Sequence, residues 1–218
     1  MDGDLLLDDY ILGLTGSSRP RVCFVPTACG DACESIVEFY RAFSSRSEAA
    51  DLTLFDRRVQ DPREFLLSQD VIYVGGGNTA NMLGVWRVHG VDDILREAWE
   101  RGIVLCGTSA GASCWFEACV TDSFGPMLAP LHDGLGLLPG SFCPHYDGEA
   151  QRRPTYERLV ADGFPAGYAL DDAVATRFIG TELEECVTTK QEASAYWVEL
   201  LGREVVHTNL EPRVIGPG

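Results

Sequence analysis

One serine of this chain lies in a residue pattern that exposes a nucleophile. The segment 107–111 reads Gly-Thr-Ser-Ala-Gly and matches G-x-S-x-G, in which a strand turns sharply into a helix. An apolar run at 103–106 precedes it and a helical pattern at 110–118 follows, which is the context that the motif requires. We therefore predict that Ser109 attacks carbonyl carbon. The alternative is a glycine-rich turn whose serine only caps a helix.

A second glycine-rich turn, at 75–79, could supply main-chain donors. Consecutive glycines before a helix expose N–H groups, which suit an anion or an oxyanion. The N–H of Gly76 or Gly77, together with that of Ala110, would make a two-donor oxyanion hole. The turn also fits a dinucleotide fingerprint formally, but the acidic residue expected about 20 positions later should end a strand. Residues 91–100 show a helical pattern instead, so we favour the oxyanion hole.

A serine nucleophile needs a base, and the chain has four histidines. His145 is favoured because Pro144 stiffens the backbone before it and the segment resembles a strand end. His89 stands before a glycine at the end of a helical pattern, as a C-terminal cap does. His132 lies in a long loop region and His207 in a late strand-like segment. His145 is therefore the candidate base among the four.

The base in turn needs a carboxylate to orient it. Asp122, in Thr-Asp-Ser-Phe-Gly, and the pair Asp171-Asp172, at a strand end, are the candidates, and the residues do not choose among them. The basic cluster near these segments contains Arg153 and two neighbouring arginines. It either neutralises a helix face or places one arginine to bind a substrate carboxylate in a bidentate contact.

Composition excludes several classes of protein. The 17 basic residues stand against 33 acidic ones, a net charge of −16, which argues against nucleic acid and against anionic membrane surfaces as partners. The one lysine, Lys190, lacks the flanking residues of a P-loop, a pyridoxal site or a Ser-Lys dyad. The eight cysteines form no C-x-x-C pair, so we expect reduced thiols and no metal site. No cofactor is expected.

The catalytic segments must be positioned by a mostly parallel sheet. Short apolar runs rich in β-branched residues alternate with segments of helical spacing, which predicts an α/β fold: one domain over residues 1–218, with helices on both faces of the sheet. We expect early strands at 21–26, 52–55, 71–74 and 103–106. We expect helices at 31–45, 78–88, 91–100 and 149–162. A loop at 125–148 and an antiparallel extension of the same sheet, at 173–180, 185–189, 195–200 and 204–210, would follow.

No segment resembles a targeting or membrane-spanning sequence. The first residues are acidic where a secretory signal would be basic, and no run of 18 apolar residues occurs. We therefore expect a cytoplasmic protein. If the chain associates with itself, a homodimer is the commonest form.

Five segments, taken in order and spacing, resemble the peptidase E family: VIYVGGGN, GTSAGA, TDSFG, PHYDGE and GYALDDA. The resemblance covers roughly residues 20 to 205. That family contains α-aspartyl dipeptidase and the related cyanophycinases, and its fold is similar to that of class I glutamine amidotransferases. The resemblance implies a serine peptidase that cleaves dipeptides or other small peptides, with N-terminal Asp as one expected preference.

The resemblance also implies roles for single residues. Ser109 matches the family nucleophile and His145 its base, while Gly77 and Ala110 match the positions that form the oxyanion hole. The family's acid varies: Asp122 matches one of its positions, and Asp172 lies near the other. An arginine after the histidine binds the aspartyl side chain in the dipeptidase. The expected substrate-binding residues are therefore Gly76, Asn78, Thr108 and Arg153.

Two other functions remain open. The order Ser109, Asp172, His207 is that of an α/β-hydrolase esterase, although the chain is short and the HGGG loop of lipases is absent. The same scaffold could instead bind a small ligand without catalysis.

Overall fold

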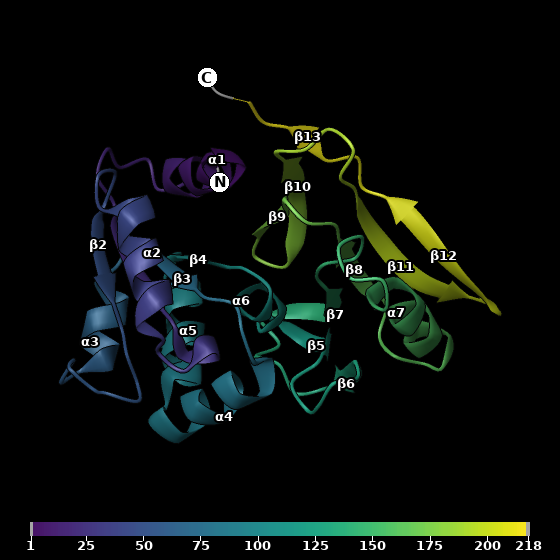
Figure 1. The fold of residues 1–218 in the computed structure, drawn as a ribbon, viewed down its shortest axis with the longest axis horizontal. Helices are drawn as coiled ribbons and strands as arrows, with labels where there is room; N and C mark the ends of the chain where they lie inside the picture. The colour runs from purple at the N-terminus through teal and green to yellow at the C-terminus, as the bar shows by residue number, and fades with distance from the viewer. Residues whose placement is uncertain (1, 217–218) are drawn as a thin grey trace. The chain divides into compact units, whose positions relative to one another are not determined.

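The computed structural model describes the backbone of residues 2–216 and the side chains of residues 5–216 (Figure 1). Its helices are α1 (Asp2–Gly13), α2 (Cys33–Phe43), α3 (Pro62–Leu67), α4 (Thr79–His89), α5 (Val91–Glu100), α6 (Ala110–Ser113) and α7 (Arg152–Ala161), with the short 3₁₀ helix η1 (Thr27–Cys29). Its strands are β1 (Arg21–Val25), β2 (Glu48–Asp51), β3 (Val71–Val74), β4 (Val104–Gly107), β5 (Phe116–Thr121), β6 (Ala129–Leu131), β7 (Leu138–Cys143), β8 (Gly167–Leu170), β9 (Val174–Ile179), β10 (Glu182–Thr188), β11 (Ala195–Leu201), β12 (Glu204–Asn209) and β13 (Arg213–Val214).

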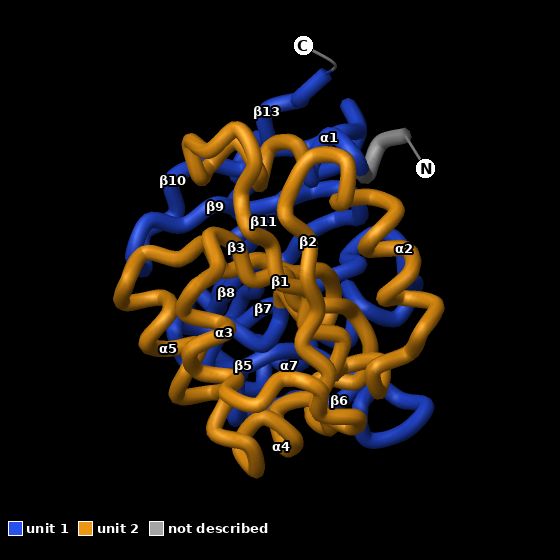
Figure 2. Tube along the Cα trace, turned by 90° about the vertical axis from the view of Figure 1, so that its left-hand side faces the viewer, with its two compact units in different colours: residues 1–8, 113–218 blue, residues 9–112 orange. Residues whose placement is uncertain are grey.

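The chain divides into two compact units (Figure 2). Residues 9–112 form one, called here the N-terminal unit, and residues 1–8 with 113–218 form the other, called the C-terminal unit. The expectation that residues 1–218 make one domain stays a prediction. Each unit is described by itself below.

The N-terminal unit is built on a four-stranded sheet in the order β2-β1-β3-β4, with every pair parallel. The chain moves from β1 to β2 in one direction and then back across β1 to β3 and β4. Because crossovers between parallel strands are right-handed, α2 must cover one face of the sheet, and α3 and α5 the other. Accordingly, α3 packs on α5 while α2 packs on β1 and β2 (Figure 1). The predicted α/β class, with a parallel sheet between helices, is confirmed.

Apolar side chains hold α2 to this sheet. Val22, Phe24 and Val71 point from the strands into a cluster with Phe39 and Phe43 of α2. The Phe39 ring stacks on those of Phe24 and Phe43, each at 4.8 Å between centroids. Aromatic pairs in such contact stabilise a fold by more than the burial of their apolar area alone. The contacts with α2 therefore hold the strands in place and, with them, the turns at their carboxyl ends.

The C-terminal unit contains a six-stranded sheet in the order β12-β11-β8-β7-β5-β6. Its centre is parallel, since β7 pairs with β5 and β8 in that sense, and both sides are antiparallel. Helix α7 packs on β11 and β12, and the Tyr156 hydroxyl at its buried face lies 2.7 Å from the Ser141 hydroxyl on β7. A separate three-stranded sheet has the order β13-β10-β9.

Several predicted elements are wrong. The run at 52–55 is a loop after β2, apolar because Leu52 and Leu54 are buried; the Asp31 carboxylate accepts from the amides of Leu54 and Phe55, at 2.6 and 2.8 Å. The helix expected at 110–118 ends at Ser113, since 116–121 pairs as β5 with β7. Strand β5 is buried on both faces at nearly every position, so its sequence lacks the alternation of polar and apolar residues that would have indicated a strand.

The late part of the chain also differs from expectation. The supposed loop at 125–148 contains β6 and β7, and β7 supplies a central strand of the six-stranded sheet. The late strands are antiparallel, as predicted, but they do not extend one sheet: β11 and β12 join the six-stranded sheet, whereas β9 and β10 pair in the three-stranded one. Strand pairing depends on contacts between distant segments, which periodicity does not report. The other expected helices and early strands are confirmed with small shifts at their ends.

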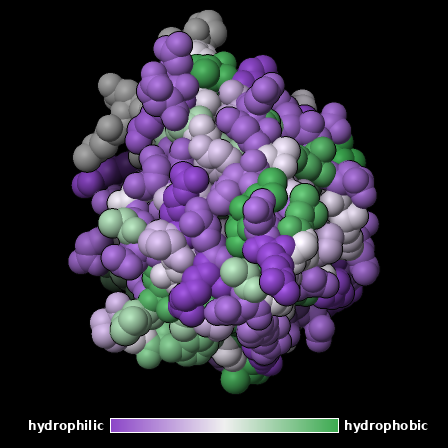
Figure 3. Space-filling view, turned by 90° about the vertical axis from the view of Figure 1, so that its right-hand side faces the viewer, coloured by the Kyte–Doolittle hydropathy of each residue, from purple (hydrophilic) through white to green (hydrophobic). Residues whose placement is uncertain are grey.

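Figure 3 shows one face of the molecule, where hydrophilic residues dominate and hydrophobic ones gather in small groups. Across the described residues, no helix has the length and apolar character that crossing a membrane requires.

Candidate active site

Ser109 stands on a sharp turn between β4 and α6. Its φ of 53° is in the left-handed region, which costs a residue with a side chain about 1–3 kcal/mol. The turn is closed by hydrogen bonds from the Gly111 amide to the Thr108 carbonyl, at 2.8 Å, and from the Ala112 amide to the Ser109 carbonyl, at 3.0 Å. A serine with a left-handed backbone, between a half-buried strand and a helix, has the geometry expected of a nucleophile elbow.

The two flanking glycines leave no room for a side chain. A Cβ on Gly107 would lie 2.5 Å from the Gly111 carbonyl oxygen, and one on Gly111 would lie 2.2 Å from the Val74 carbonyl oxygen. Both oxygens belong to the backbone, so neither can move aside cheaply. The G-x-S-x-G spacing is therefore a steric requirement here, because it lets the turn press against β3.

The glycine-rich turn after β3 lies beside the serine turn. A Cβ on Gly76 would be 3.4 Å from the Ser109 Cβ. Gly77 has a φ of 138°, and a Cβ there would lie 2.2 Å from the Ala28 carbonyl oxygen, so only glycine fits. The Asn78 amide donates to that same oxygen at 2.8 Å, and its side-chain Oδ1 caps α4 by accepting from the Asn81 amide at 2.8 Å. Asn78 thus anchors the turn and starts the helix.

The two predicted oxyanion donors keep their amides available. Among the residues that the structure describes, the N–H groups of Gly77 and Ala110 donate no hydrogen bond. Both follow carboxyl ends of parallel strands, where ligands bind in open α/β sheets. Thr108 donates its amide to the Val74 carbonyl oxygen at 3.2 Å, which makes it part of the turn's framework.

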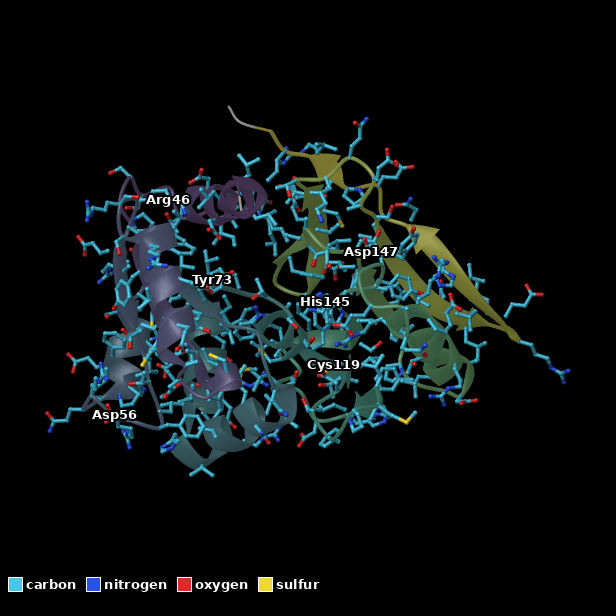
Figure 4. All side chains as sticks on the ribbon, in the orientation of Figure 1. Arg46, Asp56, Tyr73, Cys119, His145 and Asp147 are labelled. Carbon is cyan, nitrogen blue, oxygen red and sulfur yellow. The ribbon has the colours of Figure 1, made fainter. Side chains whose placement is uncertain are left out.

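His145 lies in the C-terminal unit, on the segment between β7 and α7 (Figure 4). Its Nδ1 atom is 2.6 Å from Oδ1 of Asp172, the distance of a strong hydrogen bond. His145 has a φ of 56°, the second candidate residue with a left-handed backbone. The neighbouring Tyr146 amide donates to the Leu170 carbonyl oxygen at 2.9 Å, which ties this segment to the end of β8. An imidazole held at Nδ1 by a carboxylate presents Nε2 as a base.

The other candidate carboxylates have different surroundings. Asp122 is exposed on the turn after β5, where its carbonyl oxygen accepts from the Gly125 amide at 3.3 Å. The Asp171 carboxylate accepts from the Ser194 amide at 2.8 Å, and burial raises the pKa of this carboxyl. Of the three predicted acids, Asp172 is the one bonded to His145.

The other histidines make structural contacts. His207 on β12 lies 2.9 Å from the Tyr146 hydroxyl and 3.1 Å from the Glu157 carboxylate, and burial lowers its pKa. The His132 ring packs edge-on against that of Phe164, at 5.1 Å between centroids. His89 is the last residue of α4, but the C-cap of that helix is Gly90, whose amide donates to the Trp86 carbonyl oxygen, so the prediction that His89 is the cap is wrong.

The predicted substrate-binding arginine is held by its neighbours on α7 and β11. The Arg153 Nε donates to the Glu157 carboxylate at 3.0 Å, and its guanidinium lies 5.4 Å from the Tyr146 ring and 5.9 Å from the Tyr196 ring. The hydrogen bond to Glu157 raises the pKa of Arg153. Arg152, in contrast, is buried and bonded to Glu149 at 2.7 Å, so it has a structural role.

Two residues beside His145 were missed by the sequence analysis. The Asp147 carboxylate accepts from the Asp172 amide at 2.8 Å, and Gly148 lies so near Asp172 that a Cβ there would be 2.4 Å from its Oδ2. Both belong to the segment PHYDGE that contains His145. An Asp-Gly pair that begins two residues after a candidate base is the signal that could have indicated them.

The cysteine next to this segment is poorly suited to act as a nucleophile. Cys143 is fully buried, and burial raises the pKa of its thiol to about 12. A thiol attacks carbonyl carbon as the thiolate, which such a pKa suppresses.

The chain matches the model of peptidase family S51 over residues 2–186. A relative from Bacillus subtilis (strain 168), the uncharacterized peptidase YgaJ, is 46% identical over 215 residues, which span 98% of this chain and 93% of that protein. A peptidase E from Shewanella denitrificans is 30% identical over 125 residues, or 53% of this chain and 53% of that protein.

Two solved structures share the fold. A putative peptidase E protein from Listeria monocytogenes aligns with a TM-score of 0.56 and 20% identity, over 92% of this chain and 93% of that one. A peptidase from an acI-B1 actinobacterium aligns with a TM-score of 0.59 and 18% identity, over 94% of this chain and 86% of that one. The resemblance noted in the sequence is thereby confirmed, and the chain belongs to peptidase family S51, a family of peptidases.

Proposed function

We propose that this chain is a serine peptidase that hydrolyses dipeptides or short peptides through an acyl-enzyme on Ser109. The observation that carries the proposal is the strained turn at Ser109. The backbone of Ser109 is in the left-handed region, between two glycines whose positions admit no side chain. Such backbone strain costs free energy and clusters at functional sites, which supports a chemical role for the Ser109 hydroxyl.

His145 is the proposed base and Asp172 its orienting acid. The 2.6 Å contact at Nδ1 supports this, since it would hold the proton on that nitrogen and leave Nε2 to accept one from the Ser109 hydroxyl. Fully buried Cys143, with a raised thiol pKa, supports the choice of a serine over that cysteine.

The proposed reaction has two halves. The Ser109 Oγ attacks the scissile carbonyl carbon as His145 takes the hydroxyl proton, and the oxyanion is stabilised by the amides of Gly77 and Ala110. His145 then gives its proton to the leaving amine as the C–N bond breaks. A water molecule loses a proton to His145 while attacking the ester, and the proton returns to Oγ as the acid leaves. Each oxyanion donor would lower the barrier by about 3–4 kcal/mol.

Arg153 is the proposed source of a preference for N-terminal Asp, with Gly76, Asn78 and Thr108 near the bound peptide. Its planar guanidinium is suited to a carboxylate, and the rings of Tyr146 and Tyr196 limit its motion. A molecule with a net charge of −16 repels anionic substrates, so a local cation would be needed to bind one. The proposed setting is the cytoplasm, where buried thiols such as Cys23 stay reduced.

The esterase alternative requires His207 to pair with Asp172. His207 is bonded instead to Tyr146 and Glu157, and Asp172 to His145, which favours the peptidase proposal. The two differ in a simple comparison: His145→Ala should abolish hydrolysis, whereas His207→Ala should retain it. The reverse result would reject the peptidase mechanism.

A fluorophosphonate probe tests the nucleophile directly. We expect one equivalent of label on Ser109, complete loss of labelling in Ser109→Ala, and unchanged labelling in Ser45→Ala, which alters an exposed serine after α2. Circular dichroism should show both variants folded. A folded protein that takes up no label and hydrolyses no peptide would favour the non-catalytic, ligand-binding alternative.

A further inference from the structure

Three bonds join two segments of the C-terminal unit around His145. The segments are 145–149, before α7, and 170–172, at the end of β8. The Tyr146 amide donates to the Leu170 carbonyl at 2.9 Å, and the Asp172 amide donates to the Asp147 carboxylate at 2.8 Å. The third contact joins the side chains of His145 and Asp172 at 2.6 Å.

We propose that Asp147 is a positioning residue that holds the main chain of Asp172 so that the Asp172 carboxylate meets Nδ1 of His145. Its role in catalysis rests on the proposed function, because it acts only through His145. Its role in geometry does not depend on that function and can be measured separately.

The position of Asp172 needs such support. Its side chain is 45% exposed, and Asp172 is the second residue after the end of β8, so the sheet ladder does not fix it. An exposed carboxylate that pairs with another side chain must give up rotamer freedom, which often cancels the gain from pairing. A hydrogen bond from the Asp172 amide to a charged oxygen is stronger than one between neutral groups. That bond fixes the backbone from which the Asp172 side chain projects.

Gly148 completes the arrangement by leaving space. A Cβ at this position would lie 2.4 Å from Oδ2 of Asp172 and 3.1 Å from its Cγ. The φ of Gly148 is not positive, so its backbone conformation does not require glycine. Glycine is needed here because a side chain would collide with Asp172. The Asp147-Gly148 pair thus contributes an acceptor for the Asp172 amide and a gap for the Asp172 carboxylate.

Asp171 does not perform this task. Its carboxylate accepts from the Ser194 amide, and its own amide donates to the Ser194 carbonyl at 3.0 Å. Asp171 therefore attaches the end of β8 to the residue before β11. The carboxylates of Asp147, Asp171 and Asp172 lie in one short region but have three different partners.

The test compares Asp147→Ala with Asp147→Asn. Asparagine keeps a side-chain oxygen that can accept from the Asp172 amide, whereas alanine removes it. We expect kcat/KM to fall about tenfold or more in Asp147→Ala, because small displacements of catalytic groups are costly. In Asp147→Asn, whose neutral oxygen makes a weaker bond, it should fall much less than in Asp147→Ala. Nitrogen-15 NMR of the His145 ring should show a changed Nδ1 resonance and a shifted pH titration in the alanine variant only.

Asp61→Ala is the matched control. The Asp61 carboxylate also accepts from backbone amides, those of Arg63 and Glu64 at 2.9 and 3.0 Å, but at the start of α3. This variant should lose stability while its kcat/KM per folded molecule and its His145 resonances stay unchanged.

Two results would overturn the proposal: an Asp147→Ala variant with wild-type kinetics and His145 resonances, or an Asp147→Asn variant as impaired as Asp147→Ala in both. Failure of the proposed function would appear differently. A wild-type protein without hydrolase activity, whose His145 resonance still changes in Asp147→Ala, would support the positioning role and reject the peptidase mechanism.

Discussion

The Nδ1 atom of His145 lies 2.6 Å from Oδ1 of Asp172, a residue 27 positions later in the chain. This contact links two segments that follow parallel neighbouring strands, β7 and β8. The carboxyl ends of such strands share one edge of a sheet, so residues distant in sequence meet there.

Asp172→Asn should therefore reduce activity far more than Asp122→Asn. The amide keeps the shape of the side chain but removes the charge that stabilises the imidazolium and holds its tautomer. We expect kcat to fall about a hundredfold to ten-thousandfold for Asp172→Asn and to stay near wild type for the exposed Asp122. Steady-state kinetics on a cleaved dipeptide measures both. Equal losses would indicate that Asp172 is not the acid.

Gly111→Ala should destabilise the N-terminal unit. The new Cβ would lie 2.2 Å from the Val74 carbonyl oxygen, and the backbone of β3 would have to move. Overpacking of this kind costs about 1–3 kcal/mol. Gly84→Ala is the control, because Gly84 is exposed on α4 and a Cβ there meets nothing within 4 Å. It should stabilise the helix by about 0.5–1 kcal/mol. Urea unfolding would show opposite shifts; shifts of the same sign would contradict this reading of the turn.

His207 should make stability depend on pH below neutrality. Burial lowers the pKa of His207 in the folded protein. The charge of Arg153 lowers it further, whereas Glu157 acts to raise it. The unfolded chain, with a histidine pKa of about 6.5, therefore binds the proton first as pH falls. Unfolding then takes up a proton, so stability decreases from about pH 6.5 down through the lowered pKa. His207→Gln should show a weaker decrease in urea unfolding between pH 7.5 and 5, and an unchanged slope would refute the assignment.

Arg153→Ala should weaken any preference for N-terminal Asp. Loss of a charged contact to the substrate carboxylate should lower the ratio of kcat/KM for Asp-X over Ala-X by about tenfold to a hundredfold. Arg158→Ala, on the same helix and 3.8 Å from the Asp162 carboxylate at the surface, is the matched control and should leave the ratio unchanged. If the wild-type protein cleaves Asp-X and Ala-X at equal rates, the aspartyl preference is rejected.

Local patterns predicted much of the N-terminal unit. The turns at Gly77 and Gly111 could be predicted because the need for glycine is a local property of the sequence. The helices α2, α4 and α5 could be predicted because the spacing of their apolar residues is local too. The motif around Ser109 likewise specified a turn whose strain the structure then displays.

Pairing between distant residues could not be predicted in this way. The sequence alone determined the α/β class, the tight turn at Ser109 and a short set of candidate acids and bases, since each depends on neighbours within a few positions. Tertiary structure decided that β5 is a strand, that His145 pairs with Asp172 while His207 pairs with Glu157, and that Asp147 holds the Asp172 amide. Such contacts arise from packing between segments far apart in the chain, and no local spacing reports which carboxylate a histidine will meet.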